Sequence, residues 1–112
     1  MEREQIRYTV ADYLEIVALP ENENKRLELI DGIIEEMAPS RKKNTEVALA
    51  IGAFIFMYVY QNDLGYASGA DGGYQIDETT LLMPDVGFIS KNRTSGKDDG
   101  VAYEVAPDLA VE

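Results

Sequence analysis

The chain has 112 residues, 46% of them hydrophobic, with 10 Lys and Arg against 21 Asp and Glu, and it contains no His, Cys or Trp. This length suits one domain, and the hydrophobic content excludes a disordered acidic tail despite the net charge of −11. Without His or Cys the chain cannot supply an imidazole base, a thiolate nucleophile or a soft-metal site, so its chemistry must use carboxylates, Lys, Tyr, Ser or Thr and oxygen-binding metal ions.

The first predicted element is a short helix that begins after Thr9. Thr9 can cap this helix, and Asp12 lies three residues on, where a capping box places its acidic or amide side chain. Apolar residues then recur at helical spacing until Leu19 and Pro20 end the pattern.

A β-hairpin is the clearest local signal in the sequence. The apolar runs at residues 27–30 and 33–37 flank Asp31 and Gly32. A two-residue loop between such runs favours a type I′ turn, which needs positive φ at both positions, and Asp-Gly is a preferred pair there. The sequence therefore predicts an antiparallel pair of strands joined at Asp31 and Gly32.

The longest predicted element is a helix over residues 45–61. Asn44 is the expected N-cap, and Glu46 would lie in the first turn, where an acid interacts favourably with the helix dipole. Apolar residues occupy all faces of this helix, and a single sheet can cover only one of them. We expect another helix layer, further chain or a partner subunit to cover the rest.

From about residue 65 the hydrophobic period shortens towards two, which predicts strands. The expected strands are residues 66–68, 73–77, 81–90 and 107–112, and the expected turns are residues 70–73 and 77–80. Residues 91–100 have the composition of a mobile loop, and residues 101–105 are ambiguous. This order of elements favours a mixed α/β fold.

Two apolar stretches of the predicted strands directly follow the same Pro-Asp pair. Asp85 follows Pro84, and Asp108 follows Pro107 in the segment that ends at Glu112. Since Pro84 has no N–H to give to a ladder, we expect the strand to be irregular or at an edge there. If neighbouring strands bring Asp85 and Glu112 together, the pair would bind a divalent cation or shift its pKa values. The alternative, which spacing alone favours, is that both acids are simply solvated.

Taken together, these segments resemble the Uma2 family of predicted endonucleases, which has a restriction-endonuclease-like PD-(D/E)XK fold. The resemblance extends over almost the whole chain and depends on the order and spacing of residues 8–14 (YTVADYL), 26–32 (RLELIDG), 37–39 (MAP), 83–90 (MPDVGFIS) and 107–112 (PDLAVE). It implies a mixed sheet with helices on both sides, one domain over residues 1–112, and a metal-dependent DNA endonuclease.

The resemblance also implies which residues form the site. Asp85 would match the aspartate of the PD element and Glu112 the acid of the (D/E)XK element, and both would hold Mg²⁺ or Mn²⁺. Glu28 matches the acid of the family's ELIDG segment and could act in catalysis, and Glu46 could add a metal ligand from the head of the long helix. The alternatives are a solvent-facing strand residue for Glu28 and an acid that only favours the helix dipole for Glu46.

Two departures from the family pattern bear on activity. Family members often carry a His near the start of the long helix, where this chain has Asn44, and they continue past Glu112 into a helix that supplies a catalytic Lys. Lys91 and Lys97 lie in the predicted loop and are poor substitutes. We therefore expect a C-terminally incomplete domain with little or no nuclease activity of its own. The competing hypothesis is a non-catalytic homo-oligomeric interaction module on the same fold.

Charge and hydropathy limit the partners. Affinity for a DNA backbone normally comes from Lys and Arg, so DNA as a partner follows from the resemblance and not from the net charge of −11. The longest apolar run, residues 47–60, is shorter than the roughly 20 residues that cross a bilayer. The charged N-terminus has no apolar segment of a secretory signal. We therefore expect a cytoplasmic protein without a membrane span.

Overall fold

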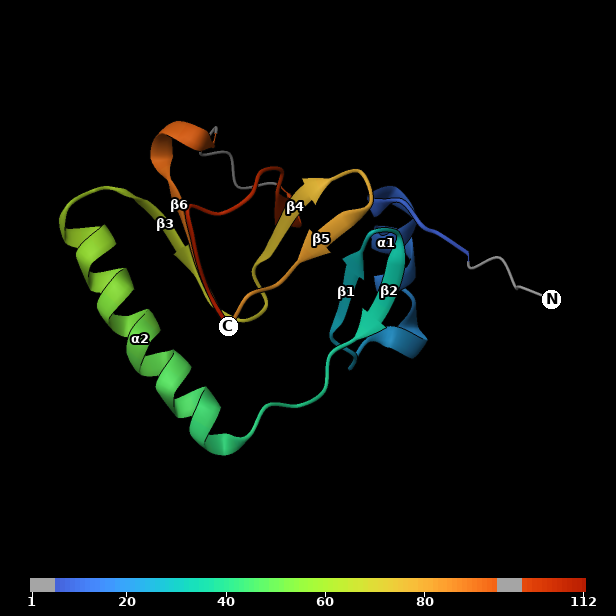
Figure 1. The fold of residues 1–112 in the computed structure, drawn as a ribbon, viewed down its shortest axis with the longest axis horizontal. Coiled ribbons are helices and arrows are strands. Elements are labelled where there is room, and N and C mark those ends of the chain that lie inside the picture. The colour runs from blue at the N-terminus through green and yellow to red at the C-terminus, as the bar shows by residue number, and fades with distance from the viewer. Residues whose placement is uncertain (1–5, 95–99) are drawn as a thin grey trace.

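The structure, a computed structural model, describes residues 6–94 and 100–112, so residues 95–99 of the expected mobile loop lie outside the described part. Its elements are α1 (Val10–Val17), β1 (Leu27–Ile30), β2 (Ile33–Glu36), α2 (Lys42–Gln61), β3 (Gly65–Ser68), β4 (Gly73–Asp77), β5 (Thr80–Leu82), β6 (Val86–Ser90), β7 (Ala102–Tyr103) and β8 (Leu109–Val111), with 3₁₀ turns at Pro20–Asn22 and Lys91–Arg93 (Figure 1). This arrangement confirms the mixed α/β class.

Helix α1 begins with the predicted capping box. The Thr9 side chain accepts a hydrogen bond from the Asp12 N–H at 3.2 Å, and the Asp12 carboxylate accepts one from the Thr9 N–H at 3.0 Å. Val10 and Tyr13 are buried against the sheet, and the Tyr13 hydroxyl donates to the carbonyl of Leu27. The cap thus fixes the start of a helix whose inner face packs on β1.

The predicted hairpin is also confirmed. Strands β1 and β2 pair antiparallel, and the turn residues Asp31 and Gly32 have φ values of 47° and 80°. Both turn residues therefore have the positive φ that a type I′ turn needs. At Gly32 a side chain is also excluded by space, because a Cβ there would lie 2.9 Å from the Cβ of Arg7.

Strands β2, β1, β5, β4 and β7 form one sheet in that order, in which only the β4–β7 pair is parallel among the described strands. The core between this sheet and α1 consists of Val10, Tyr13, Leu27, Leu29 and Leu81. Leu29 and Tyr74 have no exposed surface. Burial of these side chains is the main term that stabilises this part of the molecule.

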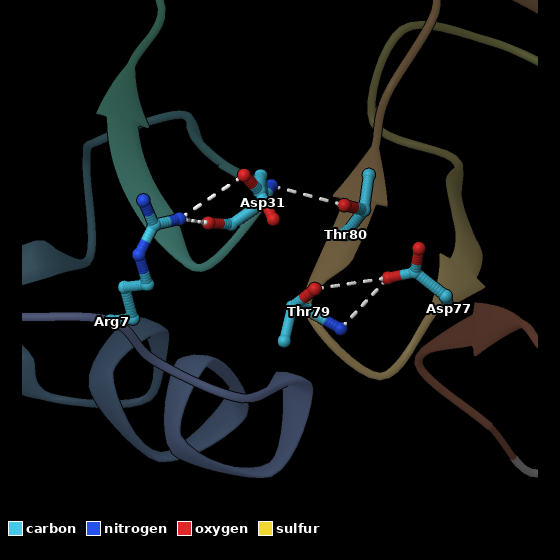
Figure 2. A network of polar contacts seen from close by, with 5 residues as sticks. All are labelled: Arg7, Asp31, Asp77, Thr79 and Thr80. Atoms are coloured by element: carbon cyan, nitrogen blue, oxygen red, sulfur yellow. Dashed lines mark hydrogen bonds and ion pairs between the residues drawn. The ribbon is translucent and has the colours of Figure 1, made fainter.

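Polar contacts join the two turns at one end of this sheet (Figure 2). The Arg7 guanidinium donates to the Asp31 carbonyl at 2.7 Å and lies 3.1 Å from the Asp31 carboxylate. The Asp31 N–H donates to the Thr80 hydroxyl at 3.0 Å, while the Asp77 carboxylate accepts from the Thr79 N–H at 2.9 Å. These bonds fix the β1–β2 turn beside the β4–β5 turn.

Strands β3, β6 and β8 form a second, fully antiparallel sheet with β6 in the centre. The prediction of one strand over residues 81–90 was therefore wrong, because β5 and β6 belong to different sheets. Pro84 lies between them and lacks the N–H that a continuing ladder would need. The sequence pattern showed the apolar residues but not the change of sheet.

Tyr74 connects the two sheets. Its hydroxyl lies 2.6 Å from the Ser68 hydroxyl, so a hydrogen bond joins β4 of the first sheet to β3 of the second. Its ring lies over Gly87 of β6, where an added Cβ would come within 2.5 Å of the Tyr74 oxygen. The relative position of the sheets, and hence of the acids at their edges, depends on this buried contact.

Helix α2 begins earlier than expected. Its N-cap is Arg41, without a side-chain capping bond, and the first turn contains no acid. The predictions that Asn44 caps the helix and that Glu46 lies in its first turn were therefore wrong. The Thr45 N–H donates to the Arg41 carbonyl at 3.1 Å and the Thr45 hydroxyl to the Lys42 carbonyl at 2.7 Å, so residues 42–44 already belong to a helical turn.

The molecule is elongated, with extents of 55 × 34 × 28 Å and a radius of gyration of 15.3 Å. A compact chain of this length would have a radius of about 13 Å. Figure 1 shows the cause, since α2 lies along one edge, away from α1 and the β1–β2 hairpin. Within the described residues, no helix combines the length and hydropathy of a membrane span.

Candidate functional site

The pairing of β6 with β8 brings Asp85 and Glu112 together. In this antiparallel ladder Val86 lies opposite Val111. Asp85 directly precedes β6 and Glu112 directly follows β8, so the two acids continue the register as a facing pair. Two residues that are far apart in the sequence therefore lie at the same end of one sheet.

Glu28 reaches the same region from the other sheet. Its carboxylate accepts a hydrogen bond from the Met83 N–H at 2.7 Å, two residues before Asp85. The side chain is half-buried, so it does not have the solvent-facing position that was its alternative interpretation. This bond joins β1 to the segment that leads into β6. It therefore helps to fix the position of Asp85.

Glu112 interacts electrostatically with both Glu28 and Asp85. Burial raises the pKa of the Glu112 carboxyl, and the charges of Glu28 and Asp85 raise it further. Glu46 is exposed on α2, and no described interaction joins it to the other three acids. The structure thus brings together Asp85, Glu112 and Glu28 of the four candidates.

A pocket of about 530 Å³ opens beside Asp85. It lies between the first half of α2 and the end of β3, and its lining includes Arg26, Asn44, Thr45, Phe56, Ser68 and Asp85. Most of its surface is apolar, and Arg26 provides a positive charge in the same pocket as Asp85. Such a concave site with a few polar groups is the usual form of a small-ligand pocket.

Arg26 is a residue that the sequence reasoning missed. Its guanidinium donates to the Ala70 carbonyl at 2.7 Å and pairs with the Asp71 carboxylate at 3.3 Å, which holds it at the pocket wall. The signal that could have identified it is the period of the strand. Arg26 and Glu28 are two residues apart and therefore lie on one face of the β1 segment, whereas Leu27 and Leu29 face the core.

A metal ion here would have two carboxylates as its main protein ligands. Among residues 6–94 and 100–112, no group of three or more acidic side chains is arranged to hold a metal ion. Asp85 and Glu112 nevertheless provide hard oxygen ligands, and Mg²⁺ is commonly bound by one or two carboxylates together with water and substrate phosphate. The donor set therefore fits a magnesium-type ion.

A sequence model of the Uma2 family, described as "Putative restriction endonuclease", matches residues 10–112. The chain belongs to the Uma2 family. The match covers both helices, both sheets and all four candidate acids, so the family resemblance is confirmed over nearly the full sequence. No curated protein matches this Uma2 chain.

Lys91, one of the two lysines considered as substitutes for the family's catalytic Lys, does not lie with the candidate acids. Lys91 follows β6 at the end opposite Asp85, and its ammonium group lies 2.7 Å from the Asp63 carboxylate. Lys97 lies outside the described residues. The basic residue that lines the pocket together with Asp85 is Arg26, which directly precedes β1.

Replacing Glu28 with Gln is expected to lower the pKa of Glu112 towards its ordinary value. Of the two neighbouring charges, Glu28 raises the pKa of Glu112 more than Asp85 does. The Gln carbonyl oxygen can still accept from the Met83 N–H, so the backbone should stay in place. A ¹³C NMR titration of the Glu112 side-chain carboxyl measures this change directly.

Glu36→Gln is the matched control. Glu36 lies opposite Leu27 in the hairpin ladder. Because Leu27 and Glu28 are neighbours in one strand and point to opposite faces, Glu36 and Glu28 also lie on opposite faces of the sheet. The Glu36→Gln substitution removes the same charge from the same hairpin and should leave the pKa of Glu112 unchanged. An unaltered Glu112 titration in Glu28→Gln would contradict the proximity of these acids.

Proposed function

We propose that this Uma2 chain carries a divalent-metal site for phosphodiester hydrolysis, with Asp85 and Glu112 as the metal ligands. The observation that carries the proposal is the β6–β8 register, which makes these two acids a facing pair. Membership of a restriction-endonuclease family supports DNA as the substrate class.

The raised pKa of Glu112 supports a cation at this position. Burial and two neighbouring acids disfavour the charged carboxylate, and a bound cation would offset that repulsion. Mg²⁺ or Mn²⁺ bound there would neutralise phosphate charge and acidify a water molecule. Glu28 is a positioning residue in this proposal, because its bond to the Met83 N–H holds the segment that carries Asp85.

Arg26 and the pocket beside Asp85 would receive the substrate. Hydrolysis joins the oxygen of water to phosphorus and breaks the bond from phosphorus to one sugar oxygen; the water gives up a proton and the leaving sugar oxygen takes one up as a hydroxyl. Negative charge gathers on the phosphate oxygens during this step, and a guanidinium in the same pocket as Asp85 can pair with that charge. Because the chain carries a net charge of −11, we expect few further backbone contacts and weak DNA binding by this chain alone.

The second candidate function is a non-catalytic homo-oligomeric module. The specific observation that favours it is the exposure of α2, where Phe54 and Tyr58 are 80% and 65% exposed. Self-association through α2 would use a different surface from the proposed metal site. We also infer that residues 1–112 act as one domain and that the protein works in the cytoplasm, where DNA and Mg²⁺ are both available.

Paramagnetic Mn²⁺ tests the proposed site in the full 112-residue chain. In ¹⁵N-labelled protein, low Mn²⁺ concentrations should broaden the amide signals of Asp85, Val86, Val111 and Glu112 first. Excess Mg²⁺ should reverse the broadening, because both ions would occupy the same oxygen ligands. Broadening spread evenly over the many exposed acids would contradict a site at Asp85 and Glu112. A plasmid-nicking assay with the same sample measures the activity.

A further inference from the structure

Helix α2 has three apolar stripes, one of which packs against a sheet. One faces β3 and β6, where Val59 is 5% exposed and a Cβ on Gly52 would lie 3.3 Å from Val86. The second lines the pocket through Leu49, Ala53 and Phe56. The third consists of Val47, Ile51, Phe54 and Tyr58, which are 49%, 37%, 80% and 65% exposed, and we call it the outer stripe.

We propose that the outer stripe binds the outer stripe of a second copy of this chain, with the two α2 helices antiparallel. Its residues are spaced by four, three and four positions, which is the spacing of a coiled-coil seam. The positions that flank such a seam, including Ala50 and Met57, are also uncharged. The stripe can therefore pack against a copy of itself along its length.

The exposed area is enough for a weak contact. Phe54 and Tyr58 offer the largest surfaces, and the exposed parts of the outer stripe and Met57 together amount to roughly 550 Å² per copy. Two copies together would bury roughly 1,100 Å², which is the size range of weak or transient interfaces. We therefore expect a weak dimer that forms only as the protein concentration rises.

Charge favours a second copy in the antiparallel direction. Residues 47–62 contain no charged side chain, whereas residues 41–43 form a basic cluster at the head of α2. In an antiparallel pair each cluster lies near the C-terminal end of the other helix, which carries partial negative charge and is followed by Asp63. A parallel pair would place the two basic clusters side by side.

Sedimentation velocity over a concentration series of the full chain tests this interface. The wild-type protein should change from monomer to dimer as its concentration rises. Phe54→Asp should raise the dimer dissociation constant by about tenfold or more, because it places a charge at the centre of an apolar contact. Circular dichroism checks that the variant stays folded. A wild-type chain that remains monomeric up to submillimolar concentration would overturn the proposal.

Leu49→Asp is the matched control, because it adds the same charge to the same helix at a residue that is 76% exposed. Leu49 lies on the stripe that faces the pocket, so this variant should dimerise like the wild type. Equal loss of the dimer in both variants would contradict the assignment to the outer stripe.

Cysteine cross-linking tests the direction of the helices. The chain has no Cys of its own, so an introduced pair gives a clean signal. An antiparallel pair brings position 47 of one copy close to position 58 of the other, so a mixture of Val47→Cys and Tyr58→Cys should form the mixed disulfide on mild oxidation. Preferential formation of the disulfide between two Val47→Cys chains would refute the antiparallel arrangement.

Discussion

Asp85→Asn is expected to weaken Mn²⁺ and Mg²⁺ binding by at least about a hundredfold, since loss of a direct ligand costs more than the 10- to 100-fold typical of losing a residue that only orients a ligand. The variant removes one of the two carboxylates that the β6–β8 ladder brings together. Asn keeps the size of the side chain, so the change isolates charge from packing. Isothermal titration with Mn²⁺, together with the amide broadening described above, measures the loss.

Asp108→Asn is the control for that experiment. Asp108 also follows a proline, but its carboxylate accepts from the Ser90 N–H at 2.7 Å and pairs with Arg93 at 3.0 Å. Removing it should leave ion binding unchanged. Equal losses in both variants would mean that Mn²⁺ responds to the overall negative charge and not to a defined site.

The Asp108→Asn control should also change how the stability of the fold depends on pH. The hydrogen bond from the Ser90 backbone, the largest cause, and the neighbouring Arg93 lower the pKa of Asp108. Its contribution to stability is therefore present above the unfolded pKa of about 4 and is lost as pH falls through the lower folded value. Asp108→Asn should reduce the loss of stability on acidification, which melting curves at neutral and acidic pH can measure.

Gly87→Ala is expected to destabilise the fold by about 3 kcal/mol, at the upper end of the usual cost of an overpacked core. A Cβ at position 87 would meet three atoms of the Tyr74 ring and hydroxyl at 2.5–2.8 Å. Tyr74 cannot move away easily, because it has no exposed surface and its hydroxyl bonds Ser68. Urea denaturation followed by fluorescence or circular dichroism measures the free energy of unfolding.

Gly69→Ala provides the comparison for this clash. No heavy atom lies within 4 Å of the position that its Cβ would occupy. This surface change should alter stability by less than about 0.5 kcal/mol. If Gly87→Ala were as stable as Gly69→Ala, Tyr74 would not be the fixed link between the two sheets.

The elements that the sequence predicted well are those whose signals are local. The Thr9 and Asp12 capping box and the Asp31 and Gly32 turn each depend on neighbouring residues and on their φ preferences, and both are confirmed. The strands at residues 73–77 and 107–112 were also found from alternation and flanking turn residues.

The wrong predictions concern element boundaries that depend on tertiary packing. The apolar run at residues 81–90 looks continuous, but Pro84 and the separate sheets divide it. The start of α2 was misplaced because Asn44 is a good capping residue, while the helix continues back to Lys42. In both cases a local preference was weaker than the tertiary arrangement.

The sequence by itself determined the acidic character, the two helices, the hairpin and most of the later strands, and the presence of acids next to apolar strand segments. Only the tertiary structure decided which acids meet, because strand register brings Asp85 to Glu112 and the Met83 hydrogen bond brings Glu28 to them, while Glu46 stays apart. It also decided which face of α2 stays open, since an all-round apolar helix carries no signal of which side a sheet will cover. Side-chain chemistry is encoded locally, whereas proximity across strands depends on the whole fold.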